Sequence, residues 1–246
     1  KQQEIKRQKM VRNSFIGGFA IMLLFAGVFL SQRNRISKEK KRSDELLLNI
    51  LPEETAEELK ETGTAKAKSF DMVTVMFTDF KNFTQASERL TPQELVNEIN
   101  YCYSEFDRII VRYGIEKIKT IGDAYLSVSG MPNPDEMHAV NAVGAALEIL
   151  DFIIKRKENG GLFDIRIGLN SGPVVAGVVG VKKFAYDIWG DTVNTASRME
   201  SSGEVGRVNI SGTTHALVRD AVAAEPALVF EPRGRVHAKG KGELEM

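Results

Sequence analysis

The stretch 13–32 restricts the possible folds of this chain more than any other feature, because it contains no charged residue. Its apolar run, Phe15 to Leu30, can cross a hydrocarbon core of roughly 30 Å as a helix. A buried core helix and a signal peptide are the alternatives, but both ends are flanked by basic residues and no small-residue cleavage pattern is present. The sequence therefore predicts a single transmembrane helix at 13–32, preceded by a juxtamembrane segment at 1–12.

The basic residues of the first part of the chain gather around this run, whereas the rest of the chain is correspondingly acidic. They are Lys1, Lys6, Arg7, Lys9 and Arg12 before it, and Arg33, Arg35, Lys38, Lys40, Lys41 and Arg42 after it. Because both flanks are basic, counting positive charges barely decides the orientation of the helix. Over the whole chain 33 basic and 33 acidic side chains cancel, so the total charge gives no sign of nucleic-acid binding.

Cysteine and histidine usage excludes two kinds of structural support. Cys102 is the only cysteine, so no intrachain disulfide can form and a reducing compartment is expected. It lies within an apolar helical pattern, which predicts a small buried side chain. The three histidines, His138, His215 and His237, lack the spacing of zinc ligands.

The segment 33–63 is charged and favours helix. Ile36, Ser43 and Ile50 are spaced by sevens, which is a weak coiled-coil pattern, and Pro52 then interrupts or restarts the helix before a short second helix from Glu53 to Lys60. We interpret this segment as a dimerising connector. An exposed polar linker helix is the alternative, because fewer than three clean heptads are present.

From Phe70 onward, strand and helix patterns alternate, which predicts an α+β domain at 64–246 with an antiparallel sheet covered by helices. The run Met72 to Thr78 is a candidate buried strand, Thr91-Pro-Gln-Glu94 is a capping box that opens a long amphipathic helix, and Gly122-Asp123 closes a hairpin between 115–121 and 124–128. Further strands are expected at 164–169, 174–179, 185–189 and 207–210, with a turn at Ser171-Gly172-Pro173, and further helices at 136–157, 191–200 and from 211 onward.

Two aspartates fall where strands end. Asp79 follows the first strand and Asp123 lies at the tip of the hairpin, so both carboxylates can lie at one end of the sheet. Paired carboxylates repel each other unless a cation lies between them, and Mg²⁺ accepts such oxygens together with phosphate oxygens. The alternatives are ordinary local roles, in which Asp79 caps the following helix and Asp123 favours the turn.

Several separated motifs resemble, in order, those of the class III adenylyl and guanylyl cyclase catalytic domain over roughly residues 49–246. They are Leu51-Pro-Glu-Glu54, Phe77-Thr-Asp-Phe-Lys-Asn-Phe-Thr84, Glu116-Lys-Ile-Lys-Thr-Ile-Gly-Asp-Ala124, Ile165-Arg-Ile-Gly-Leu-Asn-Ser-Gly172, Tyr186-Asp-Ile-Trp-Gly190, Val193-Asn-Thr-Ala-Ser-Arg-Met199 and Lys239-Gly-Lys-Gly242. The resemblance implies a ferredoxin-like or palm-like antiparallel sheet. It also implies that Asp79 and Asp123, with the Phe80 carbonyl, hold two Mg²⁺ or Mn²⁺ ions.

The same resemblance implies roles for residues that contact the nucleotide. Asn194 would orient the ribose and Arg198 would stabilise the phosphates in the transition state. Lys119 and Asp187 would read the purine. The triphosphate would be bound by the loop Phe80, Lys81, Asn82, Phe83 and Thr84, by Lys239, and with help from Arg166.

The chemistry of Lys119 and Asp187 favours adenine. A lysine donates to adenine N1 and an aspartate accepts from the 6-amino group, whereas guanine presents a 6-oxo acceptor together with ring and amino donors. The resemblance therefore implies an adenylate cyclase that converts ATP to cyclic AMP and pyrophosphate. A guanylate cyclase and a catalytically inactive nucleotide-binding module are alternatives, and a cyclic-dinucleotide synthase is disfavoured because no Gly-Gly-Asp/Glu-Glu-Phe run is present.

The family places its metal aspartates on one subunit and the asparagine and arginine on the partner. Because this chain carries every role, we expect a homodimer with two shared sites. We also expect a single-pass protein of the cell membrane with a cytoplasmic catalytic domain, controlled by a sensor region upstream of this chain.

Overall fold

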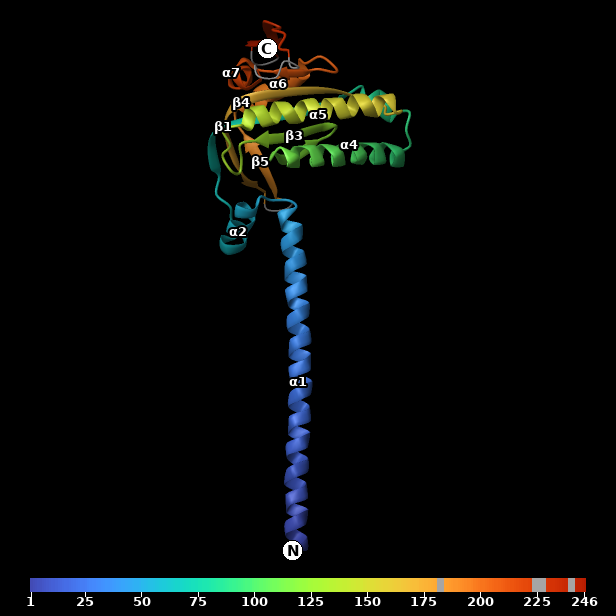
Figure 1. Cartoon of the computed structure of the whole chain (residues 1–246), viewed down its shortest axis with the longest axis vertical. Helices are drawn as coiled ribbons and strands as arrows, with labels where there is room; N and C mark the ends of the chain where they lie inside the picture. Colours follow the sequence, from blue (N-terminus) through green and yellow to red (C-terminus); the bar gives the residue numbers. More distant parts are fainter. Residues whose placement is uncertain (181–183, 223–228, 239–241) are drawn as a thin grey trace. The chain divides into compact units, whose positions relative to one another are not determined.

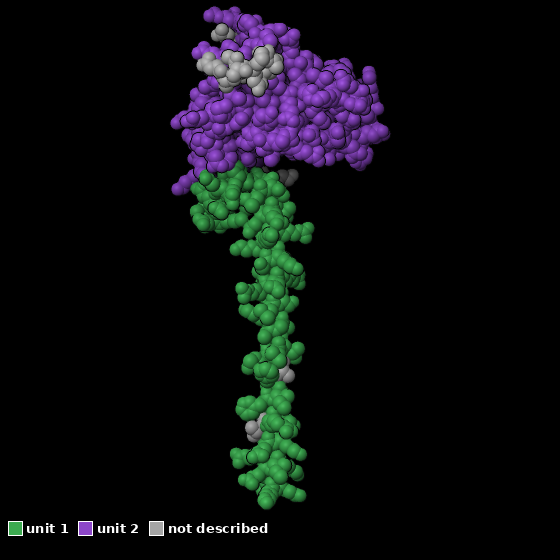
Figure 2. Space-filling view, in the orientation of Figure 1, with its two compact units in different colours: residues 1–64 green, residues 65–246 purple. Residues whose placement is uncertain are grey.

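The computed structural model describes residues 1–180, 184–222, 229–238 and 242–246. The chain divides into two compact units, Lys1–Thr64 and Ala65–Met246, which Figure 2 distinguishes by colour. The first unit consists of helices α1 (Gln2–Leu48) and α2 (Glu53–Thr62). The second unit contains all the strands and the remaining helices among the described residues.

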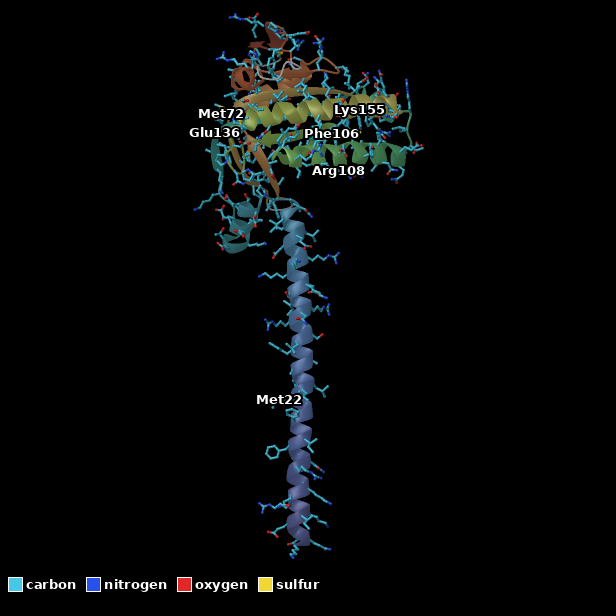
Figure 3. The ribbon with its side chains drawn as sticks, in the orientation of Figure 1. Met22, Met72, Phe106, Arg108, Glu136 and Lys155 are labelled. Atoms are coloured by element: carbon cyan, nitrogen blue, oxygen red, sulfur yellow. The ribbon has the colours of Figure 1, made fainter. Side chains whose placement is uncertain are left out.

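Helix α1 runs through the apolar stretch and on into the charged connector without interruption. It contains an apolar window with a mean hydropathy of 2.1, and among the described residues it is the one helix long and apolar enough to cross a membrane. The large apolar side chains that the structure describes in this window are exposed. Phe25 is 72% exposed and Met22, which is labelled in Figure 3, is 65% exposed.

The break predicted near Pro52 is present. Helix α1 ends at Leu48, and α2 begins directly after Pro52, as the sequence predicted for a short second helix. Lys60 of α2 forms an ion pair of 2.6 Å with Asp44 of α1. Gly63 ends α2 in the left-handed conformation (φ +74°), which favours glycine.

The second unit is built on a six-stranded sheet with the order β2-β3-β1-β4-β5, in which β6 also pairs with β4. All pairs are antiparallel except β4 with β6. The α+β class and the antiparallel sheet with covering helices are therefore confirmed. The elements are β1 (Lys68–Lys81), α3 (Phe83–Ser87), α4 (Pro92–Arg112), β2 (Glu116–Ile121), β3 (Ala124–Ser129), α5 (His138–Glu158), β4 (Asp164–Val179), β5 (Ala185–Trp189), α6 (Asp191–Ser201), β6 (Val208–Ile210), α7 (Gly212–Val222) and the separate hairpin β7 (Arg235–Ala238) and β8 (Gly242–Glu245).

Two helices, α4 and α5, run side by side along one face of this sheet (Figure 1). Phe106 of α4, labelled in Figure 3, is fully buried in the main core with Ile149 of α5 and Ile167 of β4. Helix α4 begins with the predicted capping box of Thr91 and Glu94, and its Cys102 is buried as expected. These helices close one face of the sheet.

Helix α6 covers the opposite face. It packs so closely on β4 that a Cβ atom at Gly168 would lie 1.9 Å from the backbone nitrogen of Glu200. Because side chains alternate along a strand, Gly168 and Arg166 face α6, whereas Ile165 and Ile167 face the core under α4 and α5. The residues of β4 on the α6 face are thus the ones that can take part in a site with that helix.

The turn predicted at Ser171-Gly172-Pro173 is wrong, because β4 is one continuous strand from Asp164 to Val179. Gly172 permits the close approach of α6, since a Cβ there would lie 2.6 Å from Thr192 Oγ1. Pro173 lies opposite a register shift in β1 between Phe70 and Val73, a bulge at which a residue without an N–H is tolerated. Both residues are typical of turns, but here Gly172 leaves room for α6 and Pro173 lies opposite the bulge of β1.

Candidate active site

The two aspartates come together at one end of the sheet. Asp79 lies near the end of β1 and pairs with Ala124 of β3, the residue that follows Asp123 in the hairpin. Gly122 takes a positive φ of +64°, which lets the hairpin turn tightly and carry Asp123 at its tip. The residue that precedes the next helix is Asn82, so Asp79 does not cap it.

The surroundings of Asp79 make its negative charge costly. Burial raises the pKa of the Asp79 carboxyl above its usual value, and the charge of Asp123 raises it further, while the hydrogen bond and charge of Arg166 act in the opposite direction. The two carboxylates therefore repel each other, as paired carboxylates do without a cation between them.

Arg166 is the partner that the chain itself supplies to Asp79. Its Nη2 lies 2.9 Å from Asp79 Oδ2 and also 2.9 Å from Glu200 Oε1. Its Nη1 donates to the carbonyl of Ser201 over 3.3 Å. Burial raises the pKa of Glu200 to about 7, with Asp79 and Asp123 contributing and Arg166 opposing. One guanidinium thus joins β1, β4 and α6.

The loop expected from Phe80 to Thr84 is shorter than predicted. Phe80 and Lys81 belong to β1, Asn82 alone forms the connection with a left-handed φ of 60°, and Phe83 and Thr84 already belong to α3. The Phe80 ring is buried and stacks on Phe163 with a centroid distance of 4.5 Å, so Phe80 can offer only its backbone to a ligand. The backbone amides of the first turn of α3 therefore lie only a few residues after Asp79 in the chain.

Lys119 and Asp187 meet although β2 and β5 stand at opposite ends of the strand order. Lys119 Nζ lies 2.5 Å from Asp187 Oδ2, and the lysine side chain is 38% exposed, that of the aspartate 15%. The other oxygen of Asp187 accepts from the amide of Ile188 over 2.9 Å. The predicted purine-reading residues are therefore neighbours that present one donor and one acceptor group.

Asn194 and Arg198 lie one turn apart on the outward side of α6. The buried side of the helix carries Thr192, Ala196 and Glu200. Arg198 and Glu200 differ by two residues, which corresponds to about 200° around the helix axis. In the part of the chain that the structure describes, neither Asn194 nor Arg198 has a side-chain hydrogen bond or ion pair, and Asn194 is exposed.

Two residues near the carboxylates were missed by the sequence patterns. Glu200 looked like an ordinary polar position of a helix, and Tyr103 belongs to α4 without standing on the apolar face that was predicted. The Tyr103 hydroxyl is buried without a hydrogen-bond partner in the structure, and burial together with Asp123 and Asp79 raises its pKa. A predicted phosphate ligand, Lys239, lies outside the described residues.

The acidic pair fits a hard divalent cation that takes its other ligands from elsewhere. Within the described ranges no three His, Cys, Asp or Glu side chains are grouped to hold a metal ion by themselves. Asp79 and Asp123 offer oxygen atoms only, and their mutual repulsion favours a cation between them. Such a pair suits Mg²⁺ or Mn²⁺, which complete their coordination with water and phosphate oxygens.

Comparisons with known proteins agree with this geometry. Residues 65–246 match the family "Adenylate and Guanylate cyclase catalytic domain". The human Atrial natriuretic peptide receptor 2 is 42% identical over 212 residues, which cover 84% of this chain and 20% of the receptor. An Adenylate cyclase of Mycobacterium tuberculosis is 39% identical over 208 residues, which cover 84% of this chain and 46% of that enzyme. The chain thus spans less than half the length of these curated relatives.

Solved structures resemble the chain over most of its length. The guanylate cyclase domain of RhGC from Catenaria anguillulae, in complex with GTP, is 41% identical with a TM-score of 0.65, covering 72% of this chain and 95% of that domain. The adenylyl cyclase CyaB from P. aeruginosa is 27% identical with a TM-score of 0.65, covering 73% of this chain and 93% of that structure. Since the family match extends over the whole second unit, this chain belongs to the class III adenylate and guanylate cyclase catalytic-domain family.

Proposed function

We propose that this chain is the catalytic part of a membrane-anchored adenylate cyclase, which converts ATP to 3′,5′-cyclic AMP and pyrophosphate. The observation that carries the choice of ATP is the contact of Lys119 with Asp187. A nucleotide base that enters between them meets an ammonium donor and a carboxylate acceptor, which match adenine N1 and the adenine 6-amino group. Guanine would place its 6-oxo group and its ring N–H against groups of the wrong polarity.

Asp79 and Asp123 would hold the divalent cations. Bound there, Mg²⁺ or Mn²⁺ would lower the pKa of the ribose 3′-hydroxyl and neutralise charge on the phosphates. Arg166 balances part of the carboxylate charge in this structure. The backbone N–H groups at the start of α3, which follows β1 in the chain, suit phosphate oxygens as hydrogen-bond acceptors.

The reaction is an in-line displacement at the α-phosphorus. A bond forms between the ribose O3′ and the α-phosphorus, the bond from that phosphorus to the bridging oxygen breaks, and pyrophosphate leaves. The proton of the 3′-hydroxyl passes to water or to a substrate phosphate. Asn194 orients the ribose, and the Arg198 guanidinium donates to the phosphate oxygens as negative charge builds up on them.

A second copy of the chain completes each site in this proposal. Arg198 and the group of Asp79, Arg166 and Glu200 lie on opposite sides of α6, so a single chain presents them in different directions. The paired strands β4 and β5 also carry exposed apolar side chains, among them Val175 and Val179, which are 40% and 52% exposed, and Trp189, which is 40% exposed. Burial of such a surface favours dimer formation.

The exposed apolar side chains of α1 support a membrane anchor. A helix with an apolar window of this length, flanked by basic residues at both ends, is stable in a bilayer, because its apolar side chains then contact lipid and not water. The catalytic unit would then face the cytoplasm, and the charged second half of α1 with α2 would connect it to the membrane. We retain a dimerising role for this connector as part of the proposal.

The test is cyclase activity of the purified full chain in detergent, with ATP or GTP and with Mg²⁺ or Mn²⁺. We expect cyclic AMP as the main product and its loss in Asp123→Ala. Preferential cyclic GMP formation would overturn the assignment of Lys119 and Asp187 and would make the chain a guanylate cyclase. No product from either nucleotide, with a folded dimer, would instead favour an inactive nucleotide-binding module.

A further inference from the structure

Glu200 is held close to the sheet by the backbone of α6. Its backbone nitrogen contacts β4 at Gly168, where no side chain would fit between helix and strand. Its side chain is 9% exposed, and Arg166 supplies the ion-pair contact of its carboxylate. The close contact between α6 and β4 therefore holds the Glu200 carboxylate next to the sheet.

Arg166 divides its contacts between two acids. The same Nη2 atom lies 2.9 Å from Asp79 Oδ2 and 2.9 Å from Glu200 Oε1. The arginine side chain is 18% exposed and that of Asp79 is 22% exposed, so water screens these contacts only weakly. A nitrogen shared between two carboxylates holds each less firmly than it would hold one alone.

The charge balance of this group determines how Asp79 is held. With Glu200 charged, two carboxylates contact one guanidinium and the charge of Asp123 acts on both of them, which leaves negative charge that a divalent cation can neutralise. Without the charge of Glu200, Arg166 would pair with Asp79 alone, and one oxygen of this aspartate would be withdrawn from a cation. Groups that orient a metal ligand in this way commonly change metal affinity by about 10- to 100-fold.

We infer that Glu200 is a positioning residue, which acts through Arg166 to keep Asp79 oriented and available for a divalent cation. The inference rests on the proposed function, because it takes Asp79 as a metal ligand. It adds a role for α6, which presents Arg198 on one side and controls Asp79 from the other. In a dimer with shared sites these two residues of one chain belong to different sites.

The first test uses Mn²⁺ alone, without nucleotide. Binding to the full chain in detergent is measured at pH 8, above the pKa of about 7 that burial gives Glu200, by electron paramagnetic resonance of free Mn²⁺, for the wild type, Glu200→Gln and the control Glu204→Gln. Glu204 is also an acid near arginines, at 3.7 Å from Arg207 and 3.8 Å from Arg233, but it is exposed. We expect about 10-fold weaker Mn²⁺ binding in Glu200→Gln and no change in the control. Equal binding in all three proteins would overturn the inference.

A second test places the effect in one site of a dimer. Co-expressed Asp79→Ala and Arg198→Ala chains with different tags should form a mixed dimer with one intact site, to which the Arg198→Ala chain contributes Asp79. Glu200→Gln on the Arg198→Ala chain should raise the Mn²⁺ concentration for half-maximal activity by about 10-fold, whereas Glu200→Gln on the Asp79→Ala chain should not. An equal shift from both placements would overturn the inference.

The outcomes separate the two proposals. Absence of activity in the purified mixed dimer would contradict the shared site, while the Mn²⁺-binding test on the intact protein would still decide the role of Glu200. If Glu200→Gln does not fold, Arg166→Lys replaces it in both tests. A lysine keeps the charge but has no second nitrogen to hold the Ser201 carbonyl while the first contacts the two carboxylates, so a weakening of about 10-fold is again expected. Unchanged Mn²⁺ binding in a folded Arg166→Lys protein would refute the inference.

Discussion

The carboxylate end of β1 and the outward side of α6 belong to the same proposed reaction, but the chain prepares them differently. Asp79 is held in a partly buried group with Arg166 and Glu200. Arg198 and Asn194 have no side-chain partner in the described part of the chain. The side chains around Asp79 are thus held in place within one chain, whereas Asn194 and Arg198 are available to a partner chain.

Removal of a carboxylate should have the strongest effect. Asp79→Ala takes away an oxygen ligand and leaves Arg166 without its partner on β1. We expect cyclase activity to fall by roughly 10³-fold or more, since several kcal/mol of charge stabilisation are lost. The measurement is cyclic nucleotide formation at saturating Mn²⁺. Asp71→Ala, on the exposed part of the same strand, is the control and should stay near wild type. Comparable losses in both variants would point to a damaged fold.

Arg198→Ala should be nearly as harmful, but in a different kinetic parameter. Because this arginine contacts the phosphates as charge develops, kcat should fall by about 10²- to 10³-fold while KM changes little. Arg108→Ala, on the surface of α4 (Figure 3), is the control. Since Arg198 loses no side-chain partner among the residues that the structure describes, its removal should leave the unfolding midpoint unchanged. A clear drop in that midpoint would contradict the contrast between the two regions.

The purine-reading pair lies between these extremes, because it is already joined in one chain and still exposed to a ligand. Lys119→Glu replaces a donor by an acceptor, and Asp187→Ser replaces an acceptor by a hydroxyl that can donate, so the ratio of kcat/KM for ATP over GTP should fall by about 10²-fold. The matched control is Lys117→Glu with Asp107→Ser, another lysine and aspartate in contact, at 2.8 Å. An unchanged ratio in the first double variant would mean that other residues select the base.

The smallest expected effect is on how the free energy of unfolding changes with pH. Burial raises the pKa of Glu200 to about 7 from an ordinary value of 4.5. Between these pH values the unfolded chain releases this proton while the folded chain keeps it, so the free energy of unfolding falls as pH rises through the window and is level above it. Glutamine cannot ionise, so Glu200→Gln should gain stability over wild type by on the order of 3 kcal/mol from pH 4.5 to pH 8.

Urea unfolding of the detergent-solubilised chain at both pH values measures this difference. A parallel pH dependence of wild type and Glu200→Gln would show that folding does not raise the pKa of Glu200. Arg166 would then outweigh burial, and the acidic group would be held more firmly than the comparison assumes.

Sequence patterns predicted most of the sheet and the central residues of the site, because those depend on local order. Asp79 and Asp123 lie at the end of a strand and in a two-residue turn, and both features can be read from neighbouring residues. The contact of Lys119 with Asp187 spans strands far apart in the sequence, and it was expected only through the family resemblance.

The misses share a physical cause. Gly172 and Pro173 were taken for a turn, since nothing local indicates that α6 will approach one residue and that a β1 bulge will face the other. Glu200 is two residues from Arg198 in the sequence, yet its burial depends on the contact between α6 and Gly168. Periodicity indicates which side of a helix is apolar. It gives no information about a buried carboxylate of that helix that pairs with an arginine of the underlying strand.

The continuity of α1 has a mechanical consequence. At about 1.5 Å per residue, its 47 residues extend over roughly 70 Å, and an unbroken α-helix resists twisting about its own axis. A torque applied to the apolar half would therefore reach Leu48 almost undiminished, and the first swivel along the chain is the short link from Asn49 to Pro52.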